Sequence, residues 1–173
     1  VTERKDAEKA LRDSEAKYRR LFDSIDEGFC IIEKVQGPAS DPSDFRYVEA
    51  NPAFELQSGV GSVVGKTIRQ MFPGITEEWY ETYDAVLATG VPTRFVLELY
   101  ARGRVLELYA FRVEDETHRR VAVIFRDITQ RRQDEEAIRH AGERFRLLAE
   151  TMPQKMFTAT GSGDVDYFNP QWM

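Results

Sequence analysis

An internal repeat constrains the fold of this chain more than any single motif does. Residues 1–25 align without a gap on residues 128–152, a shift of 127 positions, and seven of the 25 pairs are identical. Unrelated segments of ordinary composition would share about one or two identities. The two copies then lose their similarity, until Asn51-Pro52-Ala53-Phe54 aligns with Asn169-Pro170-Gln171-Trp172 at a shift of 118 positions. We therefore expect one complete structural unit and the opening of a second.

The repeat divides the chain into four predicted parts. We expect a helical linker at 1–25, a globular domain at 26–127, a second linker helix at 128–152, and the truncated start of a second domain at 153–173. With 173 residues and 42% hydrophobic content, the chain can bury one good core with some length left over.

Composition narrows the cellular setting that we expect. The single cysteine, Cys30, rules out an internal disulfide and suits a reducing compartment, so we predict a cytoplasmic location. No apolar run approaches the roughly 20 residues of a membrane span, and no signal peptide opens the chain, so direct membrane contact is not expected. A net charge of −6 argues against nucleic acid as a partner.

The first linker carries a coiled-coil pattern. Apolar or small residues recur at alternating spacings of four and three, at Ala7, Leu11, Ser14, Tyr18, Leu21 and Ile25. We predict a homodimer through the linker helices, with Leu11, Tyr18, Leu21 and Ile25 in a short seam. The alternative is a single amphipathic helix that packs on its own domain.

After Gly28 the apolar residues no longer follow the helical spacing of the first linker. Asn51 is a predicted helix N-cap with Pro52 at the first helical position, and Thr76 is predicted to cap a later helix that ends at Gly90. Arg102-Gly103 suits a tight hairpin turn. The expected order is strands at 29–32 and 45–49, helices at 51–59, 67–71 and 76–89, and strands at 93–101, 104–113 and 120–126.

The last strand leads directly into the second linker. Asp127 is predicted to cap that helix, and Gln130 to reach back in a capping box. We expect Asp127 and Thr129 to form the junction between this strand and the helix. The strand itself is apolar on both faces, so we expect helices on one face and the N-terminal helix or a partner subunit on the other.

This order of elements, with its motifs, resembles the PAS domain family. The residues that carry the resemblance are Asn51-Pro52-Ala53-Phe54, Gly65-Lys66-Thr67 and Asp127-Ile128-Thr129-Gln130-Arg131, preceded by a helix motif within residues 12–22. The resemblance implies an α+β fold: a five-stranded antiparallel sheet in the order 2-1-5-4-3, with helices on one face and linker helices at both ends. It covers residues 15–131 fully and residues 142–173 as a second copy.

Several catalytic and nucleotide-binding patterns fail when checked residue by residue. A phosphate loop ending at Gly65-Lys66-Thr67 would need glycine at position 60, where Val60 stands. His118 and His140 have no ligand-like neighbours, and the sequence around His140 lacks the phosphoacceptor pattern of histidine kinases. With no nucleophile, base or metal set, we expect this fragment not to be an enzyme.

The cofactors of PAS relatives also lack their attachment residues here. Ile68 stands where light-oxygen-voltage members carry the flavin-reactive cysteine, and residues 76–89 contain no histidine for haem, so we predict no cofactor. Cys30 is interpreted as a small buried hydrophobe. An apolar interior remains, interpreted as solid core or, alternatively, as a ligand cavity of unknown occupant. Its candidate lining is Phe54, Met71, Phe72, Trp79, Tyr83, Val86, Phe95 and Leu97.

The resemblance implies a sensory, signal-relay and dimerisation module of a multidomain signalling protein, with Asp127 and Thr129 as the signal junction and with neighbouring PAS or output domains on the same polypeptide. A sensor histidine kinase is our first interpretation of the parent. The alternatives are a non-sensing structural spacer and an input module of a cyclic-dinucleotide cyclase or phosphodiesterase. For residues 153–173 we expect strands near 156–160 and 165–168 in a tail that is irregular or packs on another chain, because an isolated hairpin is marginal.

Overall fold

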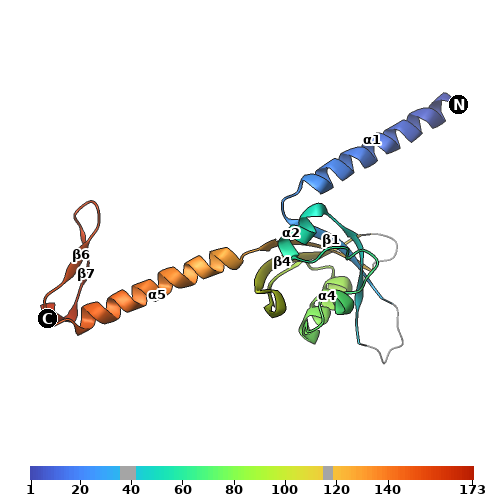
Figure 1. The fold of residues 1–173 in the computed structure, drawn as a ribbon. Coiled ribbons are helices and arrows are strands. Elements are labelled where there is room, and N and C mark those ends of the chain that lie inside the picture. Colours follow the sequence, from blue (N-terminus) through green and yellow to red (C-terminus); the bar gives the residue numbers. More distant parts are fainter. Residues whose placement is uncertain (36–41, 115–118) are drawn as a thin grey trace. The chain divides into compact units, whose positions relative to one another are not determined.

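The computed structural model describes residues 1–35, 42–114 and 119–173. The chain divides into two compact units, Val1–Thr129 and Gln130–Met173. Figure 1 shows the elements of both in sequence colours. The first unit consists of α1 (Thr2–Ser24), β1 (Gly28–Lys34), β2 (Phe45–Ala50), α2 (Pro52–Ser58), α3 (Ile68–Met71), α4 (Glu77–Thr89), β3 (Thr93–Leu99), β4 (Arg104–Arg112) and β5 (Arg120–Asp127).

The sheet of the first unit has the predicted topology. Its five strands lie in the order β2-β1-β5-β4-β3, and every neighbouring pair is antiparallel. Strand β5, the last of these five along the chain, therefore lies at the centre of the sheet, between β1 and β4. The predicted PAS fold of five antiparallel strands in the order 2-1-5-4-3 is confirmed.

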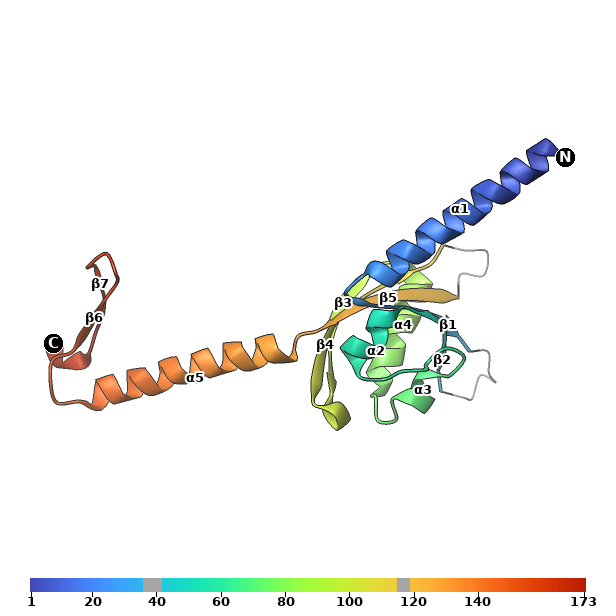
Figure 2. The same ribbon diagram turned by 45° about the horizontal axis from the view of Figure 1, so that its top comes forward.

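Helices cover one face of the sheet, and the core lies between them. Helix α2 contacts β1, β4 and β5, α3 contacts β2, and α4 contacts β4 and β5. Figure 2 shows these three helices together on one side of the sheet. Alternate strand residues such as Ile32, Leu108 and Val123 point into this layer and are buried. This alternation follows from the period of two along a strand.

The opposite face of the sheet is covered only in part. Phe22, near the end of α1, packs edge-on against Phe29 of β1, with ring centroids 5.2 Å apart. Ala122 in β5 is buried, whereas Ile124 two residues later is half-buried. The N-terminal helix therefore covers this face of the sheet, as expected, but only where Phe22 packs on Phe29 at the start of β1.

Local signals set several helix ends as predicted. Asn51 caps α2 by accepting a hydrogen bond from the Phe54 N–H, and α2 ends at Gly59 with φ of +75°. Helix α4 ends in the same way at Gly90. Thr76 does precede α4, but its side chain makes no capping hydrogen bond among the described residues. Thr76 therefore occupies the predicted N-cap position without making the hydrogen bond of a cap.

One connection differs from the sequence prediction. Strand β3 ends at Leu99 rather than at residue 101, and residues Tyr100–Arg102 form a 3-10 turn that closes at Gly103 with φ of +60°. The four residues of this turn replace the predicted two-residue hairpin. The connection between the strands predicted at 29–32 and 45–49, and the one between those at 104–113 and 120–126 with His118, lie largely outside the described residues.

The predicted capping box at the start of the second linker helix is wrong. Helix α5 begins at Thr129 and runs to Thr151 (Thr129–Thr151). Gln130 does not reach back but donates forward to Asp134, with Nε2 and Oδ1 2.8 Å apart. Asp127 instead accepts a hydrogen bond from the Thr129 N–H at 2.9 Å. A carboxylate that accepts from the N–H two residues later forms an Asx-type turn. This turn gives the first N–H of α5 a hydrogen-bond partner, and it needs no return bond from Gln130.

The second unit contains the two strands expected near 156–160 and 165–168, so an irregular tail is ruled out, whereas packing of the tail on another chain stays a prediction. After α5, the strands β6 (Phe157–Ala159) and β7 (Val165–Phe168) form an antiparallel hairpin, and Pro170–Trp172 form a 3-10 turn. Rings from the hairpin and the turn pack on each other: Phe168 and Trp172 lie 5.3 Å apart, and Phe157 and Trp172 6.3 Å apart. This aromatic cluster stabilises a hairpin that would otherwise be marginal.

No helix in the part of the chain that the structure describes is long and apolar enough to span a membrane.

Candidate functional site: interior cavity and helix junctions

A small cavity lies between the sheet and the helices of the first unit. Helix α2 contributes Phe54 and Ser58, and α4 contributes Trp79 and Tyr83. The remaining lining comes from the inward-facing residues of the strands and from α3 and the loop after it. Those residues are Cys30, Ile32, Tyr47, Ile68, Phe72, Ile75, Leu97, Leu99, Leu106, Leu108, Val123 and Phe125.

The predicted lining residues do not all reach this space. Phe54, Phe72, Trp79, Tyr83 and Leu97 line the cavity. Three others take part in the surrounding packing: Val86 is fully buried in the core, Met71 is partly buried against it, and Phe95 contacts the Trp79 ring at 4.9 Å.

Apart from Leu97 of β3, sequence reasoning missed the strand contribution to the lining. Cys30 and Ile32 alternate in β1, and Leu106 and Leu108 alternate in β4. Both pairs therefore point to the same face of the sheet. The alternation was visible in the sequence, but the register that brings these pairs to one cavity depends on long-range strand pairing.

Edge-to-face aromatic pairs occur in and around the cavity wall. Phe54 packs against Tyr47 at 5.4 Å and against Phe125 at 5.1 Å, and Tyr83 packs against Phe45 at 5.4 Å. Such pairs favour these perpendicular geometries over face-to-face stacking.

The free space inside this wall is about 40 Å³. A single water needs roughly 10–15 Å³ measured in this way, so the cavity has room for no more than a few waters. Pockets for drug-sized ligands are roughly 300–1,000 Å³. A bulky ligand such as a flavin could enter only if the surrounding side chains moved.

The polar groups of the cavity are neutral. Burial raises the pKa of the Cys30 thiol and also the pKa values of the Tyr47 and Tyr83 hydroxyls, because charged forms are disfavoured away from water. Ser58 is satisfied locally, since its hydroxyl accepts a hydrogen bond from the Val60 N–H at 3.1 Å. The cavity therefore offers hydrogen-bonding groups but no charge.

Asn51 organises the junction between α1 and the sheet. Its side-chain oxygen accepts hydrogen bonds from the N–H groups of Phe29 at 2.8 Å and Phe54 at 3.0 Å. Its side-chain nitrogen donates to the carbonyl of Glu27 at 3.0 Å and, at longer range, to Phe22 and Ile25. One buried amide therefore fixes the turn after α1, the start of β1 and the start of α2. Sequence reasoning identified the helix cap but not this wider role.

The same arrangement occurs in the second unit. Asn169 accepts a hydrogen bond from the Met156 N–H at 2.9 Å and donates to the carbonyls of Ala149 and Gln154 at 2.9 and 2.8 Å. With the shifts of 118 and 127 found in the sequence, these partners correspond to those of Asn51. The irregularity in strand pairing also recurs, between Ile31 and Ile32 in β1 and between Thr158 and Ala159 in β6.

The junction between β5 and α5 involves Asp127 and Thr129, the two predicted signal residues. The Thr129 hydroxyl oxygen accepts from the Val105 N–H at 2.9 Å, and the Ile128 N–H donates to the Val105 carbonyl at 2.8 Å. Arg104 lies 3.7 Å from the Asp127 carboxylate. These contacts attach the start of α5 to the neighbouring strand β4.

The predicted dimer-seam residues are exposed within the single chain. Leu11, Tyr18 and Leu21 are each more than half exposed, and Ile25 is 38% exposed. No residue of α1, all of which the structure describes, is buried. The Tyr18 hydroxyl donates to Glu49 at 3.3 Å, and the Tyr18 ring stacks on Phe22 at 5.6 Å. The seam is therefore available to a partner.

No cluster of potential metal ligands occurs among residues 1–35, 42–114 and 119–173. His140 is exposed on α5, 3.5 Å from Glu143 and 4.0 Å from Glu136. These neighbours lie on the same helix face at the usual spacings of three and four. His118 lies outside the described residues.

A family model described as the PAS fold matches residues 42–133. Among solved structures, the chain is similar to the PAS domain of an HTR-like protein from Haloarcula marismortui, with 20% identity, a TM-score of 0.53, and coverage of 72% of this chain and 99% of that one. It is similar to a Rhodobacter sphaeroides LOV protein, with 19% identity, a TM-score of 0.51 and 73% of each chain covered. At these identities the likeness concerns the fold. No match was found among curated proteins.

Proposed function

The chain belongs to the PAS family, and from this premise we propose that residues 26–127 are a sensory and signal-relay module whose output leaves through α5. The supporting observation is the position of β5. This strand lies at the centre of the sheet, and only Ile128 separates its last residue, Asp127, from the first residue of α5. A change in the sheet therefore acts directly on the helix that follows.

The mutation Asp127→Ala in the full-length parent tests this relay. The change removes the acceptor for the Thr129 N–H and the partner of Arg104, and should cost about 1 kcal/mol of domain stability. We expect the domain to remain folded while the output activity of the parent stops responding to its stimulus.

The matched control is Asp134→Ala, which removes an exposed carboxylate from α5 itself, where it accepts from Gln130. It should leave the response intact. A normal response in the Asp127→Ala parent would refute the role of the junction.

We also propose that the module forms a homodimer through α1. The support is the row of exposed apolar residues at coiled-coil spacing on a helix that buries none of its residues within the described chain. The predicted coiled coil therefore uses a face that is free in the monomer.

Replacing Leu21 by Glu places a charge in the proposed seam and should shift sedimentation towards the monomer. Ala16→Glu adds the same charge to α1 outside the seam and should leave the association unchanged. A wild-type chain that sediments as a monomer at high concentration would contradict the dimer.

We propose a cytoplasmic sensor histidine kinase as the class of parent protein, on the strength of the repeated PAS opening joined by a helix and the free, buried Cys30. The size of the interior cavity favours a second candidate, a structural relay without a ligand of its own, because about 40 Å³ accommodates only waters. Native mass spectrometry of the purified chain distinguishes the two: a bound mass indicates a sensor, and its absence after loading with cell extract indicates a relay.

A further inference from the structure

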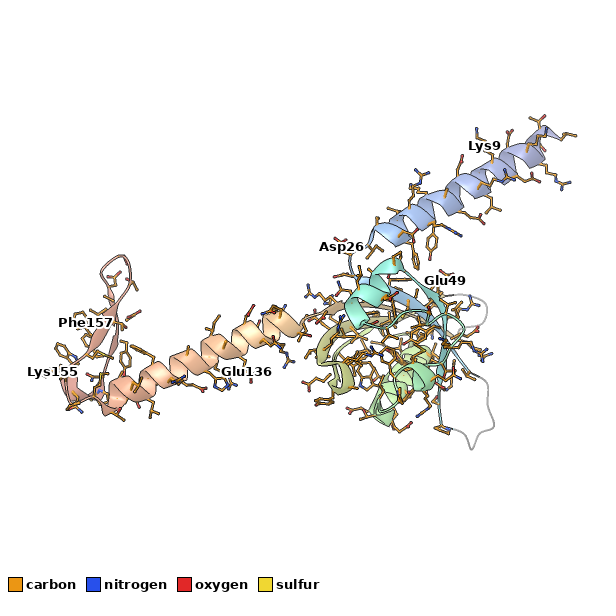
Figure 3. All side chains as sticks on the ribbon, in the orientation of Figure 1. Lys9, Asp26, Glu49, Glu136, Lys155 and Phe157 are labelled. Carbon is orange, nitrogen blue, oxygen red and sulfur yellow. The ribbon has the colours of Figure 1, made fainter. Side chains whose placement is uncertain are left out.

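The side chain of Gln57, on the last turn of α2, joins the two ends of the domain. Its Nε2 donates to the carbonyl of Asp26 at 3.0 Å, and its Oε1 accepts from the N–H of Asp127 at 2.7 Å. Asp26 lies in the turn between α1 and β1 (Figure 3), and Asp127 is the last residue of β5. These two residues are about a hundred positions apart in the sequence, yet one amide connects their backbones.

The rest of α2 strengthens the connection on both sides. At its N-terminus, Asn51 holds the turn after α1 through the Glu27 carbonyl. At its C-terminus, the carbonyls of Leu56 and Gln57 both accept from Arg104, at 2.7 Å each, and Arg104 also faces Asp127. A helix of seven residues therefore contacts the segment that arrives from α1 and the segment that leaves for α5.

The inner face of the same helix reaches the interior. Phe54 and Ser58 line the cavity, and Phe54 packs on Phe125 of β5. Phe54 and Ser58 belong to the same seven-residue helix as Gln57, so α2 connects the cavity with the two backbones that Gln57 contacts at Asp26 and Asp127.

We propose that Gln57 is a coupling residue, which transmits changes in the turn after α1 directly to Asp127 at the end of β5, rather than through the pairing of β1 with β5. The inference deepens the proposed relay function and rests on it. Glutamine is required at this position because the contact needs a donor and an acceptor in one side chain of this length. Glutamate retains only the acceptor, and alanine retains neither.

Hydrogen exchange of the Asp127 amide, followed by NMR in the 173-residue chain, tests the coupling. Phe22→Ala loosens the end of α1 by removing the ring that packs on Phe29. In the wild-type background it should speed exchange at Asp127 about fivefold, the effect of losing roughly one net hydrogen bond. In a Gln57→Glu background, Phe22→Ala should have no effect at Asp127, because the link to Asp26 is already absent.

Two controls separate coupling from general destabilisation. The amide of Val123 in the middle of β5 reports global unfolding, and exchange at Asp127 is compared with it. Leu56→Ala alters an exposed neighbour on α2 and should leave the effect of Phe22→Ala unchanged. If Phe22→Ala unfolds the chain, Tyr18→Ala, which removes the ring stacked on Phe22, replaces it.

Equal acceleration at Asp127 in the wild-type and Gln57→Glu backgrounds, or none in the wild type, would overturn the proposal. Neither result depends on the signalling output of the parent. A failure of this coupling is therefore distinguishable from a failure of the relay function, which the Asp127→Ala parent tests separately.

Discussion

Replacing Asn51 by alanine should destabilise the first unit severely, and the size of the effect follows from its hydrogen bonds. The side chain is only 4% exposed and accepts from the N–H groups of Phe29 and Phe54 while donating to Glu27. Loss of the cap on α2 costs about 1 kcal/mol. The Phe29 N–H and the Glu27 carbonyl are left without this partner, at about 1 kcal/mol each.

The expected loss of about 3 kcal/mol is large beside the roughly 5–15 kcal/mol that stabilises an ordinary domain. With a urea dependence of about 1.5 kcal/mol per M, the unfolding midpoint should fall by about 2 M. Asn51→Asp keeps the acceptor oxygens but loses the donors, so its midpoint should lie between those of the wild type and of Asn51→Ala.

Fluorescence of Trp79 provides the assay. The chain has two tryptophans, Trp79 in α4 and Trp172 in the second unit, so a Trp172→Phe background leaves one reporter within the first unit. Asn169→Ala is the internal control, because it removes the same type of bonds from the second unit. A fall of less than about 1 kcal/mol in Asn51→Ala, or an equal fall in Asn169→Ala, would refute the reasoning.

Two further measurements address the alkaline pH dependence and the independence of the units. Burial raises the pKa of Tyr80 to about 12, because the folded chain favours the neutral hydroxyl. The contribution of the neutral Tyr80 to stability is therefore complete below the unfolded pKa of about 10, and it is lost as the pH rises through the folded pKa. The urea midpoint should therefore fall above about pH 10, less steeply in Tyr80→Phe; identical slopes would contradict this. Deleting residues 153–173 should leave the Trp79 unfolding transition unchanged, whereas a large drop would show that the tail belongs to the first core.

Much of the fold could be predicted from the sequence because its signals are local. Asn51-Pro52, Gly59 and Gly90 set helix ends by their own backbone and side-chain chemistry, and the structure bears out all three. The turn at Tyr100–Gly103 could not be predicted, because its length depends on the register between β3 and β4. Register is a property of the paired strands, and neither strand specifies it alone.

The site was less accessible to sequence reasoning for the same reason. Trp79 and Tyr83 share a helical face by their spacing, so their common direction was predictable. Cys30 and Tyr47 reach the cavity from strands whose pairing is long-range, and Gln57 links segments far apart in the sequence. No local sequence pattern identifies Gln57, because its role depends on the folded chain bringing the backbones of Asp26 and Asp127 within reach of one side chain.

The recurrence of the asparagine junction in the second unit has a consequence for the order of folding during synthesis. There, an equivalent hairpin (Figure 3, around Phe157) and an equivalent asparagine junction are made by contacts within residues 149–169. The contacts concerned span about thirty residues, and loops of that size close early and rapidly. In the first unit the same junction is complete once Phe54 has left the ribosome. The nascent chain would therefore hold α1, β1, β2 and the start of α2 in their final arrangement before the central strand β5 has been made.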